Sequence, residues 1–403
     1  MNTGIDVDVI IVGGGLTGGT LALLLAKSEL RCLLLERPGS KPGQADDPRA
    51  LAITRASENI LRAAGAWEYL PEDIPGRIEK MQVWDARGKG HIEFDSAELC
   101  EASLGYIIPQ ASLERAIQQA CSNKDTIQIR QATINDLDCS TESTSLGFAE
   151  QSRVSASLVV GADGIRSRIR ELAGIPYPRH DYDQQAVACR VKTSYPHDNT
   201  ARQVFLGDGP LAFLPLANSN QCGIVWSTSP AHARLLTAMN DEVFHTQLAE
   251  AFDHRLGKII ESSERSAFPL SHAQAARYCQ PRLVLTGDAA HCVHPLAGQG
   301  ANLGLLDSAS LAEVLIGARQ KGQDLGSVSV LRRYERWRKG ENLFMIKLLQ
   351  GFKYTFESNL DSVRFARNAG LDMTNTFTPL KHFMMRRASG LSGDLPLIAR
   401  NPD

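Results

Sequence analysis

The sequence predicts an α/β protein in which a unit built on a parallel sheet is interrupted by a mostly antiparallel β-sheet unit and followed by C-terminal helices. Three observations predict this arrangement. The chain opens with an apolar strand, a glycine-rich turn, an apolar helix and a second apolar strand. Alternating apolar and polar residues, typical of half-buried strands, occur in two separate blocks, at about 76–94 and 185–228. From residue 307 onward, helical patterns dominate.

The first of these patterns is a βαβ unit. Strands are expected at Val7–Val12 and Arg31–Leu35, with a tight turn at Gly13–Gly19 and a helix at Thr20–Lys27 between them. The Pro, Gly, Gln and Asp residues at 41–48 indicate a loop. Further helices are expected at 57–64 and 112–120.

The order of these patterns predicts a discontinuous architecture. The two blocks of alternating strands are separated by segments that return to the first unit. We expect the first unit to comprise residues 1–75, 99–182 and 275–340. The β-sheet unit is expected at 76–98 and 183–274, and a helical region at 341–403.

Composition and charge favour a small-molecule partner. The chain has 403 residues, 43% of them hydrophobic, which suffices for a large core over roughly two or three domains. The formal net charge of -2 shows no excess of basic residues of the kind that binds nucleic acid. The eight cysteines include no C-x-x-C pair, so we expect reduced thiols rather than a zinc module or a redox dithiol. Without a cleavable leader pattern or about 20 uninterrupted apolar residues, we expect a cytoplasmic protein.

The first chemical motif is a G-x-G-x-x-G between a strand and a helix. Gly13 permits the turn, Gly15 lets the backbone approach a pyrophosphate, and Gly18 lets helix and strand pack closely. Glu36, at the end of the second strand, is suited to accept a hydrogen bond from a ribose hydroxyl. The pattern predicts a dinucleotide site without distinguishing FAD from NAD. The residues assigned to it are Gly13, Gly15, Leu16, Thr17, Gly18, Glu36 and Arg37.

Two further glycine-rich turns differ in the element that comes after each of them. The segment from Gly161 to Gly164 lies between an apolar strand and a helix. Its Asp163 either lies beside a phosphate or simply caps that helix, and the residues alone leave both open. The turn from Gly207 to Gly209 leads into no helix, so we expect it to join two strands.

The most specific motif runs from Val284 to Gly304. A strand delivers Asp288, whose carboxylate can hold a polyol hydroxyl. A proline- and glycine-rich loop comes next, and a helix is expected to start near Ala301 with its positive end facing a flat ring. His291 and His294 lie in this segment without a third ligand nearby, so we expect structural roles for them and no metal site.

Together, the three motifs resemble those of the single-component FAD-dependent aromatic hydroxylases in order and spacing. Within that family, four segments are similar to the ubiquinone-biosynthesis hydroxylases that act on 2-polyprenylphenols. These segments are Leu104–Ile107, 196–226, His294–Gly300 and Leu331–Arg336. The likeness covers nearly the whole chain to about residue 355. It implies a Rossmann-like FAD-binding domain interrupted by a β-sheet substrate domain.

The resemblance also implies which residues hold FAD, which we expect to be bound without a covalent link. Arg49 is expected over the flavin, and Asp163 and Gly164 beside the pyrophosphate. Relatives usually carry Glu-Asn where this chain has Pro109-Gln110, so Gln110 either supplies the flavin contact or the contact is missing. The other implied cofactor residues are Gly287, Asp288, Pro295, Gly300, Ala301 and Asn302. Those implied at the reacting centre are Pro295, Gly298, Gly300 and Ala301.

The same resemblance implies the reaction. NADH or NADPH would bind transiently and reduce the FAD, and a flavin C4a-hydroperoxide would place a hydroxyl on a polyprenylated phenol at ring carbon 5. Three alternatives stay open: another ring position, a prenyl-lipid flavin oxidoreductase that does not insert oxygen, and a catalytically idle flavin-binding scaffold. The residues leave open the choice of nicotinamide, the base that deprotonates the phenol and a homo-oligomeric state.

Two apolar regions are expected near the substrate. A lid is expected from the strand residues Phe213, Leu214, Pro215 and Trp226. The tail at 343–356 is apolar on too many sides for a simple surface helix, so it needs a partner surface. That partner is either the chain's own domains or a second copy, or else the inner membrane or an accessory protein of a ubiquinone-biosynthesis complex.

Overall fold

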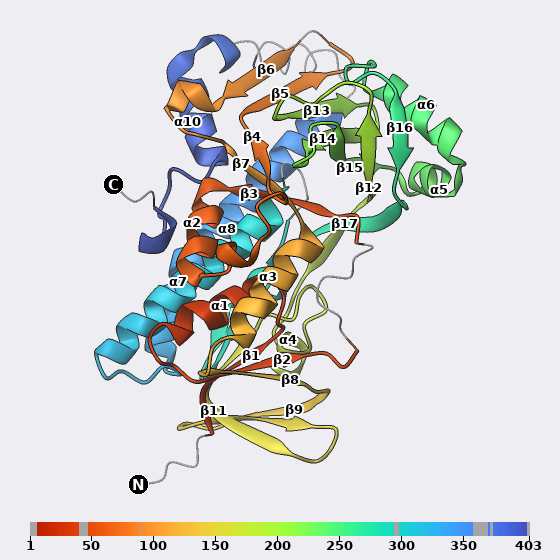
Figure 1. Cartoon of the computed structure of the whole chain (residues 1–403). Coiled ribbons are helices and arrows are strands. Elements are labelled where there is room, and N and C mark those ends of the chain that lie inside the picture. Colours follow the sequence, from red (N-terminus) through yellow and green to blue (C-terminus); the bar gives the residue numbers. More distant parts are fainter. Residues whose placement is uncertain are drawn as a thin grey trace.

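The computed structural model describes residues 6–39, 47–88, 90–293, 298–357, 370 and 374–400. In this part of the chain the strands form three sheets, and helices pack around them (Figure 1). One sheet is mostly parallel and the largest is mostly antiparallel, which confirms the predicted α/β class. The segment expected to be a loop at 41–48 falls largely outside the described residues.

The first sheet carries the predicted βαβ unit. Its strand order is β18-β19-β11-β1-β2-β8, and β1 pairs in parallel with both β2 and β11. Every residue of β2 is buried, as expected for a parallel strand covered on both faces. The strands are β1 (Val7–Val12), β2 (Cys32–Glu36), β8 (Ile127–Gln131), β9 (Ile134–Cys139), β10 (Thr144–Phe148), β11 (Arg153–Gly161), β18 (Cys279–Gln280) and β19 (Leu283–Leu285).

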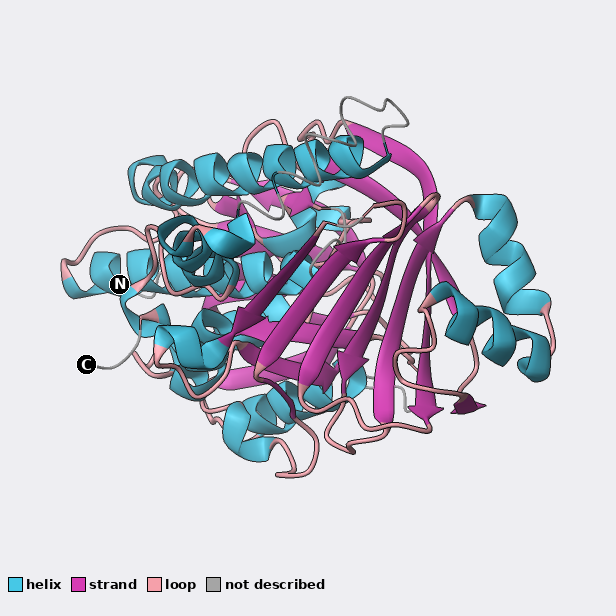
Figure 2. Cartoon of the chain, turned by 90° about the horizontal axis from the view of Figure 1, so that it is seen from above, coloured by secondary structure: helices cyan, strands magenta, loops and turns pink. Residues whose placement is uncertain are grey.

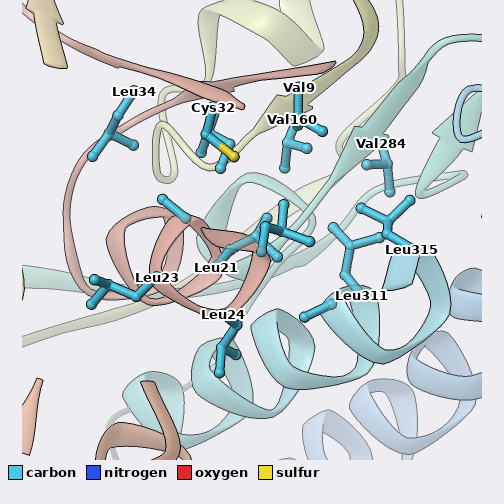
Figure 3. Close-up of a cluster of buried hydrophobic side chains, with 14 of the residues drawn as sticks. Val9, Leu21, Leu23, Leu24, Cys32, Leu34, Val160, Val284, Leu311 and Leu315 are labelled. Atoms are coloured by element: carbon cyan, nitrogen blue, oxygen red, sulfur yellow. The ribbon is translucent and has the colours of Figure 1, made fainter. Parts of the chain in front are cut away.

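Helices α1 (Leu16–Ala26) and α7 (Gln299–Gln320) pack against each other beside this sheet. Leu21 of α1 and Leu311 of α7 belong to the same buried cluster as Val9 of β1 (Figure 3). By length and composition α7 could cross a membrane. However, 67% of its most apolar 18-residue stretch is buried inside the protein, as in a core helix.

The second sheet forms a broad layer whose strands lie side by side (Figure 2). Its order is β20-β17-β12-β15-β14-β13-β5-β6, with β16 beside β12. Its strands are β5 (Lys80–Asp85), β6 (His91–Asp95), β12 (Arg179–Thr193), β13 (Thr200–Leu206), β14 (Gly209–Pro215), β15 (Gln221–Thr228), β16 (Ile259–Ser262), β17 (Ser266–Gln274) and β20 (His291–Cys292). The second predicted block of alternating residues and the first from Lys80 onward lie here, and 207–208 join β13 to β14 as expected.

A third, smaller sheet and the remaining helices complete the described part. The sheet has the order β3-β7-β4, with β3 (Ala50–Thr54), β4 (Gly76–Ile78) and β7 (Gly105–Pro109). The α-helices are α2 (Arg55–Ala64), α3 (Gln110–Ser122), α4 (Arg168–Leu172), α5 (Pro230–Ala238), α6 (Asp241–Ala251), α8 (Val328–Glu357) and α10 (Thr378–Ala388). The 3-10 turns are η1 (Trp67–Tyr69), η2 (Ser96–Leu99), η3 (Gly287–Ala289) and η5 (Leu397–Ala399).

Several element boundaries differ from the expected ones. Helix α1 begins at Leu16 rather than Thr20, because Gly18 lies inside the first helical turn, where its lack of a side chain permits close packing. The expected boundary at 340 falls inside α8, which continues unbroken through Gly340. Residues 76–78, expected in the β-sheet unit, pair instead with β7 of the third sheet.

The C-terminal half of α8 and helix α10 pack on the edge of the second sheet. Ile346 and Leu349 of α8 share a buried cluster with Val83 of β5 and Phe94 of β6. The Lys381 Nζ of α10 lies 2.7 Å from the Glu98 Oε1 of η2. The chain's own strands therefore cover one side of the tail, whereas Leu343, Phe344 and Tyr354 stay exposed.

Candidate functional site

A single cavity of about 1450 Å³ joins the parts of the molecule that carry the three motifs. Gly15 of the glycine-rich turn, Gly164 after β11 and Asp288 after β19 all line it. Arg49 and Gln110, at the ends of β3 and β7, line it as well. The structure thus brings together residues that are far apart in the sequence.

The glycine-rich turn has the backbone geometry that its spacing predicted. Gly13 has a φ of +106°, and a Cβ there would lie 2.3 Å from the Ala162 carbonyl oxygen. A Cβ on Gly18 would lie 1.9 Å from the Gly13 oxygen. Gly15 differs, since a Cβ there would have no atom within 4 Å. Its backbone therefore borders open space at the start of α1, where helical N–H groups are available to phosphates.

The other residues assigned to this motif occupy different surroundings. Leu16 and Thr17 line the cavity beside Gly15. Glu36 is buried, and its carboxylate lies so close to Gly14 that a Cβ on Gly14 would sit 2.5 Å from Glu36 Oε1. Burial raises the pKa of Glu36. Arg37 is exposed beyond the end of β2.

The Asp163 side chain caps a helix, which was one of the two alternatives for the second motif. Its Oδ2 accepts hydrogen bonds from the backbone N–H groups of Arg168 (2.6 Å) and Ile169 (3.2 Å) at the start of α4. Its Oδ1 is buried and has no hydrogen-bond partner among the described residues. That acceptor stays available to a donor on a ligand, while Gly164 lines the cavity directly.

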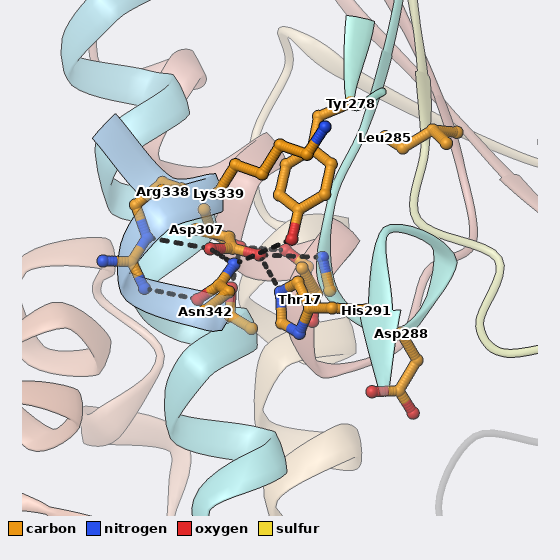
Figure 4. A network of polar contacts seen from close by, with 12 residues as sticks. Thr17, Tyr278, Leu285, Asp288, His291, Asp307, Arg338, Lys339 and Asn342 are labelled. Carbon is orange, nitrogen blue, oxygen red and sulfur yellow. Dashed lines mark hydrogen bonds and ion pairs between the residues drawn. The ribbon is translucent and has the colours of Figure 1, made fainter. Parts of the chain in front are cut away.

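Asp288 reaches the cavity from the turn after β19. The side chain is accessible and lines the cavity, yet it lies deep in the molecule, and this desolvation raises the pKa of its carboxyl. Figure 4 shows the carboxylate pointing away from the neighbouring polar network. The phenol hydroxyl of Tyr177 donates to the Asp288 carbonyl at 2.9 Å, which helps to fix the turn.

A buried polar network, which the sequence did not lead us to expect, holds the same turn from behind (Figure 4). Asp307 of α7 is fully buried and accepts hydrogen bonds from His291 Nε2 (2.5 Å), Arg338 Nε (2.9 Å) and the Gly287 N–H (3.2 Å). Asn342 donates to it as well, at 3.2 Å. Desolvation alone would raise the pKa of Asp307, but the His291 and Arg338 charges lower it. The predicted structural role of His291 is therefore confirmed. The only signal of this network in the sequence is that a charged residue, Asp307, occurs in an otherwise apolar stretch of predicted helix.

The start of α7 borders the cavity close to where it was expected. The helix begins at Gln299 after Gly298, which has a φ of +63°. Gly298, Gly300 and Ala301 line the cavity, whereas Pro295 and its neighbours at 294–297 lie outside the described residues.

The side chain of Asn302, a predicted cofactor residue, is bonded within the protein, so a contact with the cofactor is left to its backbone. Its Oδ1 accepts from the Thr54 N–H at 3.0 Å, and its Nδ2 donates to the carbonyls of Ala52 (2.8 Å) and Gly298 (3.1 Å). The side chain ties α7 to β3 rather than facing a ligand.

The second sheet turns small side chains toward the cavity. Ala186 and Ala188 of β12 and Ala212 of β14 line it, which leaves space between this face and the motif loops. The predicted lid was largely wrong. Of its four residues only Leu214 lines the cavity, whereas Phe213, Pro215 and Trp226 do not. Phe213 and Trp226 point to the opposite face of the sheet.

The error in the lid has a simple cause, since neighbouring residues of a strand face opposite sides. Phe213 is instead buried in a separate core, where its ring stacks on Phe252 with centroids 3.8 Å apart.

Comparisons with known proteins agree with this geometry. The family model described as "FAD binding domain" matches residues 6–340. The "3-demethoxyubiquinol 3-hydroxylase" of Escherichia coli is 35% identical over 388 residues, covering 95% of this chain and 98% of that protein. The "Ubiquinone biosynthesis monooxygenase COQ6, mitochondrial" of Homo sapiens is 32% identical over 434 residues, covering 95% and 92%.

Solved structures agree on the fold. The p-nitrophenol 4-monooxygenase PnpA of Pseudomonas putida has a TM-score of 0.79 at 21% identity, covering 97% of this chain and 99% of that one. Klebsiella pneumoniae HpxO complexed with FAD and uric acid has a TM-score of 0.74 at 17% identity, covering 97% and 98%. These likenesses confirm the predicted aromatic-hydroxylase fold. The family match gives FAD as the cofactor, and the open space at Gly15 and the unpaired Asp163 Oδ1 suit a dinucleotide. The chain belongs to the FAD-binding-domain family, within the group of ubiquinone-biosynthesis flavin hydroxylases.

Proposed function

We propose that the chain is a monooxygenase that uses NADH or NADPH, dioxygen and its FAD to hydroxylate the aromatic ring of a polyprenylated phenol in ubiquinone biosynthesis. The cavity carries this proposal. Its volume of about 1450 Å³ exceeds the roughly 300–1,000 Å³ of common small-molecule pockets. It therefore has room for the cofactor and for a second, largely apolar ligand. The names of the Escherichia coli and human relatives support ubiquinone biosynthesis as the setting.

The residues around the glycine-rich turn are those suited to hold the FAD. Gly15 and Thr17 border the space for the pyrophosphate, and Asp288 can accept hydrogen bonds from the polyol. When reduced by the nicotinamide, the bound FAD supplies the activation of dioxygen. Gly300 and Ala301 present the positive end of α7, which stabilises negative charge that develops at a flat ring.

The sheet face opposite these loops accepts the phenol ring and keeps water away from it. Ala186, Ala188 and Ala212 leave room for a planar ring, and Leu214 and Val225 add apolar surface. Excluding water matters because water would compete with the substrate for activated oxygen.

We propose that the hydroxyl is added at ring carbon 5. The name of one relative suggests position 3 as a second candidate. The name of the Escherichia coli relative refers to hydroxylation at position 3 of a demethoxyubiquinol. Lipid analysis of a strain lacking this protein separates the two, because the accumulating precursor lacks the hydroxyl that the enzyme adds.

We also propose that the chain works next to the inner membrane or within a biosynthetic complex, because a polyprenyl tail does not travel freely through water. Exposed apolar side chains on the C-terminal helices support this location. Leu343 and Phe344 of α8 and Phe383 of α10 are 44%, 53% and 64% exposed.

The decisive test is isotopic. The FAD-loaded protein, a short-chain polyprenylphenol, NADH or NADPH and ¹⁸O₂ should give a product that carries one ¹⁸O atom. Substrate-dependent nicotinamide oxidation without ¹⁸O in the product would indicate an oxidoreductase that does not insert oxygen. The absence of substrate-dependent oxidation would indicate an idle flavin scaffold.

Replacing Asp288 tests the placement of the cofactor. Asp288→Ala should bind FAD ten- to a hundredfold more weakly, about 1.5–3 kcal/mol, because a charge-assisted hydrogen bond is lost. Titration of the apo-protein by flavin fluorescence measures this change. Asp208→Ala, at an exposed aspartate in the turn before β14, is the matched control and should bind like the wild type. Unaltered affinity in Asp288→Ala would mean that the flavin lies elsewhere.

A further inference from the structure

The cavity extends beyond the space needed around the motif loops and the alanine-lined sheet face. A further part is lined by Val83, Ile92 and Phe94 of β5 and β6 and by Leu349, Phe352 and Phe356 of α8. We call this part the C-terminal arm. Figure 1 places β5, β6 and α10 near the top of the molecule, away from α1 and β1 in its lower half. The arm therefore leads away from the glycine-rich turn toward the C-terminal helices.

The walls of the C-terminal arm are held in place by specific contacts. The rings of Phe205 in β13 and Phe356 in α8 stack with centroids 3.6 Å apart and planes at 15°. Arg87 Nη2 donates to the Phe356 carbonyl at 2.7 Å. The Glu93 N–H donates to Asn375 Oδ1 at 3.2 Å. These contacts tie the C-terminal region to the β13-β5-β6 side of the second sheet, which faces α8 across the arm, so the space between them is a built feature of the fold.

The chemistry of the arm suits a hydrocarbon. Its six defining side chains are all aliphatic or aromatic. Of the charged residues that line the cavity, two lie on elements bordering the arm: Arg202 of β13, whose Nε donates to Gln82 Oε1 at 3.1 Å, and Lys347 of α8. Leu348 lines the cavity and is 36% exposed, so the arm reaches the protein surface on α8. A long apolar chain can thus lie in the arm and continue outside it.

We propose that the C-terminal arm binds the isoprenoid tail of the substrate while its ring lies against β12 and β14. This inference rests on the proposed hydroxylase function and adds the site that selects a prenylated phenol over a simple one. Each isoprene unit that enters the arm removes more apolar surface from water. The KM should therefore fall as the tail lengthens, until the arm is filled.

The test compares KM for a phenol with a single isoprene unit and for one with a long isoprenoid tail, using FAD-loaded protein in detergent. For the wild type, KM for the long tail should be roughly tenfold lower or more. Leu349→Trp fills the arm, and Phe352→Gln makes it polar at a partly buried position, where a polar side chain keeps some contact with water. Both variants should bring the ratio of the two KM values close to one.

Matched controls lie on the same helix outside the cavity lining. Leu343→Trp and Tyr354→Gln alter side chains that are 44% and 65% exposed and should keep the wild-type ratio. FAD content and thermal unfolding are measured for every variant. If Leu349→Trp fails to fold, Phe352→Gln decides the question.

The possible failures are distinguishable. If the wild type hydroxylates both phenols with the same KM, or if both arm variants keep the wild-type preference, the tail does not bind in the arm although the protein is a hydroxylase. If the wild type hydroxylates neither phenol, the proposed function itself is wrong.

Discussion

Gly15→Val is expected to give a folded protein that retains no FAD. Gly15 has an extended backbone, with φ of −72° and ψ of −162°, which valine adopts readily. A Cβ at this position meets no atom within 4 Å, so the fold has no clash to relieve. The added methyl groups would instead occupy the space that Gly15 leaves for the pyrophosphate. We expect at least about a hundredfold weaker binding, or roughly 3 kcal/mol.

The measurement is the ratio of flavin to protein after gel filtration, together with circular dichroism and thermal unfolding. Gly207→Val is the matched control, since Gly207 also has open space at its Cβ but lies in the exposed turn before β14. Gly13→Val offers a contrast, because its φ of +106° and the Ala162 oxygen at 2.3 Å should prevent folding altogether. Normal flavin content in a folded Gly15→Val protein would place the pyrophosphate away from this turn.

Arg338→Met is expected to produce a large loss of stability. Arg338 is 2% exposed, and its guanidinium lies on the buried Asp307 carboxylate. Methionine fills similar volume but leaves that carboxylate in the core with one fewer cationic partner. Removing one partner of a buried ion pair typically costs about 3–5 kcal/mol. The free energy of unfolding of the apo-protein in urea measures this loss without the contribution of FAD binding.

Controls and pH dependence make this prediction specific. Arg336→Met, at an exposed position on the same helix, should change stability by no more than about 0.5 kcal/mol. The interactions with His291 and Arg338 lower the pKa of Asp307, so their stabilisation is complete above its unfolded pKa of about 4 and declines as the pH falls further. The stability difference between wild type and Arg338→Met should therefore shrink below about pH 4. A pH-independent difference would show that lost packing, rather than lost charge, is the cause.

The network also links stability to cofactor binding. Asp307 accepts the Gly287 N–H, and Gly287 precedes Asp288 in the turn that borders the cavity. Arg338→Met should thus weaken FAD binding although Arg338 is on the far side of the turn from the Asp288 carboxylate (Figure 4). Arg338 is a positioning residue, and Arg338→Lys, which keeps the charge without the planar fork, should restore part of the binding.

Local patterns in the sequence were sufficient to predict the fold class, the parallel βαβ unit and the glycine-rich turn. These features have local signals, because glycine at position 13 permits a positive φ and the mostly apolar stretch Val7–Val12 is typical of a buried strand. The resemblance to a known family then supplied FAD, which no single motif could distinguish from NAD.

Other features were decided by tertiary contacts that no local pattern reveals. The lid prediction selected Phe213 and Trp226 because they are large and apolar, yet only strand register determines which face of β14 and β15 meets the cavity. Asn302 was expected beside the cofactor, and only the packing of α7 on β3, about 250 residues earlier in the chain, shows that its side-chain amide donates to the Ala52 carbonyl. Asp307 and Arg338 form a pair only because α7 and α8 pack together. Side-chain partners of this kind are fixed by packing between distant segments, and the pattern of residues along a single chain does not specify that packing.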